Sequence, residues 1–141
     1  MPPRFDLPTP DEETAPFWDA ANERRLLIQH CNACGEYFHY PRPFCPSCWS
    51  RDVEWYEASG RATLYTWSIV YVNELPPWPE RLPYVAALVD LEEGPRLMSN
   101  VVDCEFDELE GGMPLEVVFE QVSDDPLVTL PRFRPIEVRD A

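Results

Sequence analysis

Two pairs of cysteines carry the clearest chemistry in this sequence. Cys31 and Cys34 form one Cys-x-x-Cys pair, and Cys45 and Cys48 form a second, with ten residues between the pairs. Four thiolates at tetrahedral distances suit Zn²⁺, which accepts soft sulfur ligands and has no geometric preference of its own. The spacing therefore predicts one structural zinc ion per chain. A catalytic zinc is not expected, because four thiolates leave no position for water or a substrate.

Disulfides and redox chemistry are the alternative uses of these cysteines. Two disulfides would need an oxidising compartment, but the chain begins Met-Pro-Pro-Arg and shows no basic-then-apolar signal segment. Redox Cys-x-x-Cys motifs rarely occur as two pairs at this spacing outside a strand-to-helix unit. We therefore expect a cytoplasmic zinc protein. With four cysteines available, His30 and His39 are expected beside the ligands or at the surface.

The charge of the chain limits the partners that it can attract. The formal net charge is −15, from 26 acidic and 11 basic residues, and every basic residue is an arginine. Nucleic-acid affinity depends mainly on neutralising phosphates, so this charge opposes a general DNA or RNA binder. No apolar run approaches the roughly 20 residues that a membrane span requires, so we expect no membrane contact.

A short amphipathic helix is predicted ahead of the cysteines. Thr14 fits the N-cap and Pro16 the first turn, and Phe17, Trp18 and Ala21 fall on one face at helical spacing. The two aromatic residues either cover the core of the domain behind them or reach a partner, since exposed aromatic side chains dominate interface energies. The sequence alone does not separate these two roles.

The sequence after the cysteines is typical of a small β domain. Between residues 62 and 72, Tyr65 and Trp67 are predicted to share one face of a strand by period-two alternation. A proline-rich loop around Trp78 follows, then strands separated by turn residues and an acidic stretch. A set of about five short strands suits a closed barrel of the OB type, because closure protects the sheet edges. We therefore expect a mainly β chain with an N-terminal helical segment (residues 1–25), a zinc ribbon (26–52) and a five-stranded OB-fold domain (53–141).

Several motifs in order resemble a known family. The resemblance rests on these segments and their order: Gln29–Gly35, Pro41–Cys48, Ser59–Tyr65, Pro83–Val89, Glu92–Leu97 and Gly112–Val117. From Phe17 to Pro135, the chain is similar to the zinc-ribbon plus OB-fold family associated with acyl-CoA metabolism, also called domain of unknown function 35. Arg61-Ala62 departs from the family pattern, which commonly has a second glycine there.

The resemblance implies both a fold and a role. The fold would be an N-terminal helix, a rubredoxin-like zinc ribbon and an OB barrel that usually does not bind nucleic acid. Family members form heteromeric complexes with thiolases, hydroxymethylglutaryl-CoA-synthase-like enzymes or steroid side-chain aldolases, in which the thiolase-like subunit carries the chemistry. An accessory subunit of a thiolase or aldolase in lipid metabolism or steroid degradation is therefore the function that the resemblance implies.

The sequence offers no catalytic set of its own. It contains no Ser-His-Asp combination and no glycine-rich phosphate cradle, so we assign no catalytic residues. The expected partner-binding residues are Phe17, Trp18, Tyr40, Arg42 and Trp78.

Acyl-CoA is the ligand expected at the interface with the partner. Its phosphates would meet Arg42, Arg61 and Arg96, because a guanidinium matches a phosphate with two parallel hydrogen bonds. Two alternatives stay open. One is a single-stranded nucleic-acid binder that stacks bases on Tyr65 and Trp67, and the other is a stand-alone acyl-CoA binding protein.

Overall fold

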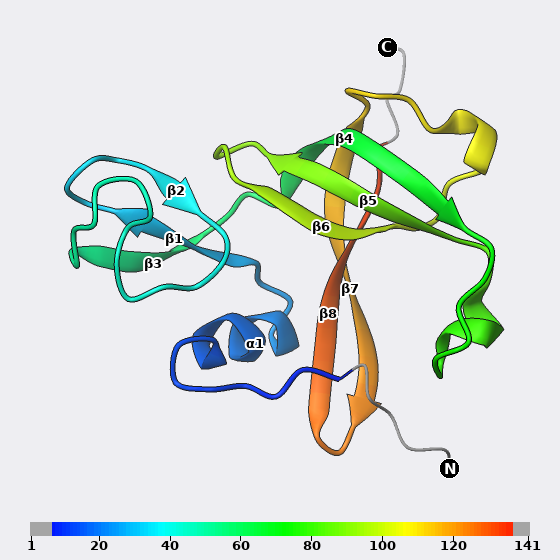
Figure 1. The fold of residues 1–141 in the computed structure, drawn as a ribbon, viewed down its shortest axis with the longest axis horizontal. Helices are drawn as coiled ribbons and strands as arrows, with labels where there is room; N and C mark the ends of the chain where they lie inside the picture. Colours follow the sequence, from blue (N-terminus) through cyan, green and yellow to red (C-terminus); the bar gives the residue numbers. More distant parts are fainter. Residues whose placement is uncertain (1–6, 137–141) are drawn as a thin grey trace.

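The computed structural model describes residues 7–136 and shows a mainly β chain (Figure 1). One α-helix precedes a three-stranded sheet, and a closed five-stranded barrel follows. The elements are α1 (Ala15–Asn22), β1 (Leu27–Cys31), β2 (Tyr37–Phe38), β3 (Val53–Glu57), β4 (Arg61–Val70), β5 (Tyr84–Leu91), β6 (Arg96–Val101), β7 (Pro114–Asp124) and β8 (Leu127–Pro135), with short 3-10 helices η1 (Trp78–Arg81) and η2 (Phe106–Glu108). The expected fold class is confirmed.

Helix α1 begins where the sequence predicts. Thr14 is the N-cap, and its hydroxyl accepts a hydrogen bond from the Asp11 backbone N–H at 3.0 Å. The Asp11 carboxylate accepts in return from the Thr14 N–H at 2.9 Å, which fixes the turn that leads into the helix. Pro16 lies in the first turn, where a missing N–H costs no helical hydrogen bond. The helix packs against β8 and β1.

The zinc-ribbon region folds as an antiparallel sheet in the order β2-β1-β3. In its centre, Gln29 of β1 pairs with Phe38 on one side and with Trp55 on the other. Strand β3, which the sequence predicts to belong to the OB-fold domain (53–141), completes the ribbon sheet, because Val53–Glu57 pairs with β1 along its whole length. The barrel strands begin at Arg61.

The barrel has the strand order β4-β5-β6-β8-β7 and closes between β4 and β7, as an OB fold does. The barrel strands with the fewest paired residues are the parallel strands β6 and β8, which pair only at Val101 and Phe133. Side chains bridge the rest of this seam. Ser99 Oγ donates to the Pro131 carbonyl at 2.9 Å, and Arg132 Nη1 donates to Asn100 Oδ1 at 2.7 Å.

Helix, ribbon and barrel share one hydrophobic core. Phe17 of α1 and Ile28 of β1 belong to the same buried cluster as Leu64, Val89 and Phe133 of the barrel. The three segments therefore stabilise one another through burial of apolar surface. No helix of the described residues has the length and apolar character needed to cross a bilayer.

The predicted shared face of Tyr65 and Trp67 is wrong. The pairing of β4 with β5 is irregular between Leu64 and Thr66, where β4 holds one extra residue. An extra residue reverses the alternation of side chains beyond it. Tyr65 is therefore 46% exposed, whereas Trp67 packs against the core.

Candidate functional site

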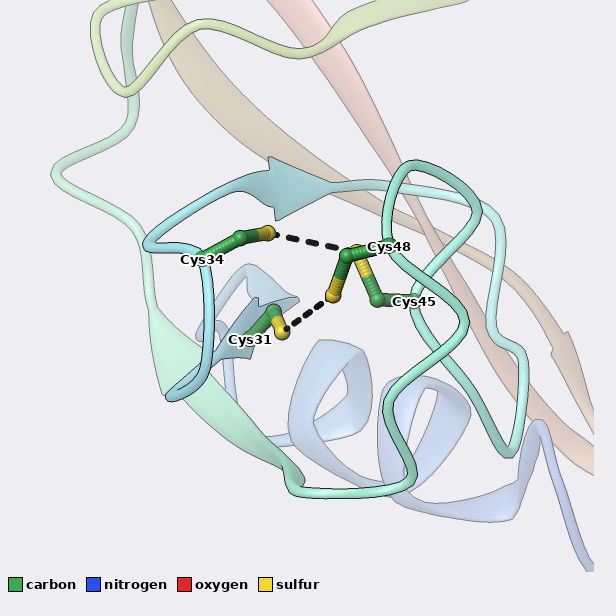
Figure 2. Close-up of side chains that lie close together, drawn as sticks. All are labelled: Cys31, Cys34, Cys45 and Cys48. Atoms are coloured by element: carbon green, nitrogen blue, oxygen red, sulfur yellow. Dashed lines mark hydrogen bonds between the residues drawn. The ribbon is translucent and has the colours of Figure 1, made fainter.

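The four cysteines of the predicted zinc site converge at one end of the ribbon (Figure 2). Their sulfur atoms all lie within 4.8 Å of one another. Two of the separations, from Cys31 to Cys48 and from Cys34 to Cys45, are 3.6 Å. A tetrahedron with Zn–S bonds of about 2.3 Å has sulfur–sulfur edges of about 3.8 Å, whereas a disulfide bond is about 2.05 Å long. The donor set and its geometry fit a structural zinc ion and not two disulfides.

The two halves of the zinc site are built by the same turn. Gly35 directly follows Cys34 with a φ of 83°, and Trp49 directly follows Cys48 with a φ of 67°. In each half, the N–H of this residue donates to the carbonyl of the first cysteine of the pair at 2.9 Å. The left-handed conformation is natural for glycine but strained for tryptophan. The exposed Trp49 ring stacks on Phe44 at a centroid distance of 5.2 Å.

Backbone N–H groups prepare one of the ligands for a metal. Burial raises the pKa of the Cys45 thiol, but hydrogen bonds from the backbone N–H groups of Cys48 and Ser47 lower that pKa to about 7. The thiolate form, which binds metal, is therefore accessible near neutral pH. The Ser47 N–H lies 3.4 Å from the Cys45 sulfur.

The two histidines, His30 and His39, lie in different surroundings. His39 is half-buried, and its ring packs edge-on against Phe17 of α1 at a centroid distance of 5.5 Å. Burial lowers the pKa of His39 to about 4, and its Nδ1 atom has no hydrogen-bond partner among the described residues. His30 packs against Tyr37 at 4.5 Å.

A groove lies where helix, ribbon and barrel meet, and we call it the junction groove. It is a cavity of about 370 Å³ with mostly apolar walls, lined by Phe17 and Trp18 of α1, by residues 39–41 of the ribbon and by residues 97–99 and 130–132 of the barrel. The expected contact residues Phe17, Trp18 and Tyr40 all come together here. Phe17 is only 7% exposed and forms part of the core, whereas Tyr40 is 59% exposed and Met98 is 68% exposed.

The segment that carries Tyr40 is held in place by a buried polar side chain. Gln29 on β1 is 6% exposed, and its Oε1 atom accepts a hydrogen bond from the Arg42 backbone N–H at 2.7 Å. Pro41 and Pro43 flank this anchor and limit the backbone further. The ribbon therefore presents Tyr40 to the groove from a fixed position.

The other two expected contact residues lie outside the junction groove. Arg42 lines a second cavity of about 300 Å³ between the ribbon and the β5–β6 turn, together with Arg96. Trp78 lines a third cavity of about 340 Å³ and packs against Tyr84 at a centroid distance of 4.7 Å. Tyr40 also lines the second cavity and so links Arg42 to the groove residues, whereas Trp78 lies apart in the third cavity.

The arginines expected to meet phosphates differ in their availability. Arg96 donates to Asp90 at 2.6 Å and its guanidinium lies 3.4 Å from the centroid of the Tyr65 ring. The hydrogen bond to Asp90 is the main reason that the pKa of Arg96 is raised. Within residues 7–136, the guanidinium groups of Arg42 and Arg61 form no ion pair, so they remain the better candidates for a phosphate.

The same contacts weaken the nucleic-acid alternative. Stacking on bases needs aromatic rings that present an open face. Arg96 covers the Tyr65 ring, and Trp67 packs against the core. The barrel therefore does not offer these two rings as a stacking platform.

Sequence reasoning missed a polar network at the β6–β8 seam. Arg132 is 9% exposed and donates to Asn100 and, at 3.2 Å, to Glu120, which also pairs with Arg81 at 2.6 Å. The pKa of Glu120 is lowered, mainly by its hydrogen bond with Arg81. The alternating pattern of β8 marks Arg132 as an ordinary strand residue, and only the pairing of strands distant in sequence brings these groups together.

The fold and the metal site define a class of protein: a zinc ribbon joined to an OB barrel, with an N-terminal helix packed against both. A family model described as the ChsH2 rubredoxin-like zinc ribbon domain matches residues 18–54, and one described as the ChsH2 C-terminal OB-fold domain matches residues 55–120. A "DUF35 domain-containing scaffold protein" of Methanocaldococcus jannaschii is 34% identical over 133 residues, which cover 90% of this chain and 94% of that protein. The chain belongs to the DUF35 family.

A relative and a solved structure extend the comparison. A "probable enoyl-CoA hydratase alpha subunit" of Thermomonospora curvata is 43% identical over 129 residues. The match covers 91% of this chain but only 39% of the length of that relative. A solved structure titled "Ltp2-ChsH2(DUF35) aldolase" contains a chain that is similar with a TM-score of 0.81 and 38% identity, covering 92% of this chain and 98% of that one.

Proposed function

We propose that this chain is a non-catalytic accessory subunit that binds and supports a thiolase-superfamily enzyme, a thiolase or steroid side-chain aldolase, acting on acyl-CoA substrates. The junction groove is the observation that carries the proposal, because it joins three segments into an apolar recess with exposed Tyr40 and Met98 side chains at its walls. The similar chain in the solved structure belongs to an aldolase whose title names a second component.

The groove has the physical properties of a docking site for a protein. Apolar recesses with exposed aromatic side chains are where a few anchor residues contribute most of the binding energy. Pro41 and Pro131 in its walls restrict the backbone, so docking orders few groups and costs little entropy. An apolar side chain of the enzyme subunit would fill the recess between Trp18 and Tyr40.

The substrate class is proposed from chemistry and from relatives. The Thermomonospora curvata relative carries a name for a CoA-ester enzyme, and the family resemblance of the motifs points the same way. We propose that the CoA phosphates meet the guanidinium of Arg42 or Arg61 at the interface with the enzyme. A bulky lipid or steroid acyl group and a cytoplasmic, hetero-oligomeric assembly belong to the same proposal.

Replacing the exposed groove residues tests the docking site. Tyr40→Ala and Met98→Lys should each weaken binding of a thiolase-like enzyme from the same cells at least about tenfold, as expected for interface anchors. Tyr56→Ala is the matched control, because this tyrosine is also an exposed ribbon residue, 41% exposed on β3, and does not line the groove. Affinities are measured by calorimetry with zinc-loaded protein.

Either of two results would contradict the proposal. If the groove variants bind the enzyme as tightly as the Tyr56 control, the groove is not the docking site. If the isolated chain binds acyl-CoA and never forms a complex with such an enzyme, it acts as a stand-alone acyl-CoA binding protein.

A further inference from the structure

Strand β4 has an edge that no other strand covers. Its first residues pair on both sides, with β5 and with β7, but the pairing with β7 ends at Thr63. From Thr66 to Val70 the strand pairs only with β5. Within residues 7–136, no backbone hydrogen bond joins residues 65–70 to any segment other than β5. We call residues 65–70 the open edge of β4, and Figure 1 shows β5 alongside this part of the strand.

The open edge lacks the features that normally prevent strands from adding to a sheet. Proteins protect unpaired edges with charged side chains and proline. Between Arg61 and Glu74 the sequence contains no charged residue and no proline, although the chain as a whole is 26% charged. The bulge after Leu64 lies at the start of the open edge and leaves the following residues regularly paired with β5.

Two other edges that pair on one side only are protected by charged residues. Strand β3 pairs only with β1 and carries Glu54 and Glu57. The far half of β7 pairs only with β8 and carries Glu120 and Asp124. Carboxylates on these two edges therefore oppose the addition of a further strand. The open edge of β4 instead carries β-branched and aromatic residues, which favour strand pairing.

We infer that the open edge of β4 receives an extended segment of the partner enzyme, which adds to the barrel as a further β-strand. This inference takes the identity of the partner from the proposed function. Main-chain hydrogen bonds to every second residue of the edge would supply affinity, and the exposed Thr66 and Ser68 side chains would supply selectivity.

Charge decides between an enzyme segment and a second copy of this chain. Two copies that joined edge to edge would bring two net charges of −15 together, which opposes self-association. A neutral or basic segment of another protein meets no such repulsion, because the edge itself is uncharged. The added strand is therefore neutral or basic and belongs to a different chain.

Two threonines of β4 provide a matched pair of variants. Thr66 and Thr63 are both exposed on the same strand, but Thr66 lies on the open edge and Thr63 pairs with β5 and β7. A lysine on an open edge blocks strand addition. Thr66→Lys should therefore weaken binding of the thiolase-like enzyme at least about tenfold, and Thr63→Lys less than about twofold. Thermal unfolding of each zinc-loaded variant shows that both are folded.

Hydrogen exchange reports the added strand directly. Outward-facing amides of residues 65–70 should exchange quickly in the isolated chain and at least about tenfold more slowly in the complex. A complex that leaves these amides unprotected, with Thr66→Lys binding as well as Thr63→Lys, overturns the inference while the proposed function stands. A dimer of the isolated chain with protected amides overturns it in favour of a second copy. Failure of any thiolase-like enzyme to bind overturns the proposed function and the inference together.

Discussion

Phe17 and Tyr40 meet in the junction groove but should respond differently to truncation. Phe17 is 7% exposed, and its ring packs edge-on against Trp18 at 4.9 Å and against His39 at 5.5 Å. Truncation of a buried phenylalanine to alanine costs about 3–5 kcal/mol, which combines lost apolar burial with the cavity that remains. We therefore expect Phe17→Ala to lower the free energy of unfolding by about 3–5 kcal/mol.

The expected loss is large compared with the whole stability of a domain. Domains are stable by about 5–15 kcal/mol, and 1 kcal/mol corresponds to about 2–4 °C in Tm for a chain of this size. Phe17→Ala should therefore lower Tm by about 6–20 °C. Urea unfolding and thermal melts of zinc-loaded protein, followed by circular dichroism, measure both quantities.

Tyr40→Ala is the matched control for this measurement. Tyr40 lines the same groove but is 59% exposed, so its truncation should change stability by about 0.5 kcal/mol or less. Phe17→Leu should fall between the two, because leucine refills part of the volume. If Phe17→Ala were as stable as Tyr40→Ala, helix α1 would not be part of the shared core and the junction groove would not exist as described.

Two further predictions concern the metal and pH. Cys34→Ser should lose zinc and unfold the ribbon, since such sites supply about 10–16 kcal/mol of apparent binding free energy in zinc-finger peptides. Cys104→Ser, outside the cluster, is the control and should keep its metal. Atomic emission measures the zinc content and circular dichroism the folding; equal zinc contents in the two variants would show that the assignment is wrong. The pKa of His39 is about 4 in the folded chain, below the usual value of about 6.5. Between these two pH values the unfolded chain binds a proton that the folded chain does not. The free energy of unfolding should therefore fall by up to about 3 kcal/mol as the pH drops from about 6.5 to 4. His39→Phe should lack this part of the pH dependence in urea unfolding, and identical pH profiles for the two proteins would refute the buried position of His39.

The features that the sequence predicted well are those set by local spacing. Ligand spacing in Cys31–Cys34 and Cys45–Cys48 is enough to predict a zinc site, because each pair forms its own turn. Thr14 and Pro16 likewise mark the start of α1 through capping chemistry within one turn. Alternation of apolar residues predicts the barrel strands one at a time.

The features that the sequence did not predict depend on contacts between distant segments. Which sheet β3 joins is decided by its pairing with β1, and the orientation of Trp67 is decided by a bulge whose position the alternation alone does not reveal. The partial burial of His39 depends on its contact with Phe17 of α1, which lies far away in the sequence. The role of Phe17 was open for the same reason; the structure places its ring in the shared core and at the wall of the junction groove.

Isolation of the chain with its natural partner tests the central claim most directly. The chain is tagged in its native cells and purified gently, its companions are identified by mass spectrometry, and the mass of the assembly is measured by light scattering. The account predicts a thiolase-like enzyme in near-equal molar amount, in a complex that acts on acyl-CoA substrates. Recovery of the chain alone, or with nucleic acid in place of such an enzyme, would contradict it.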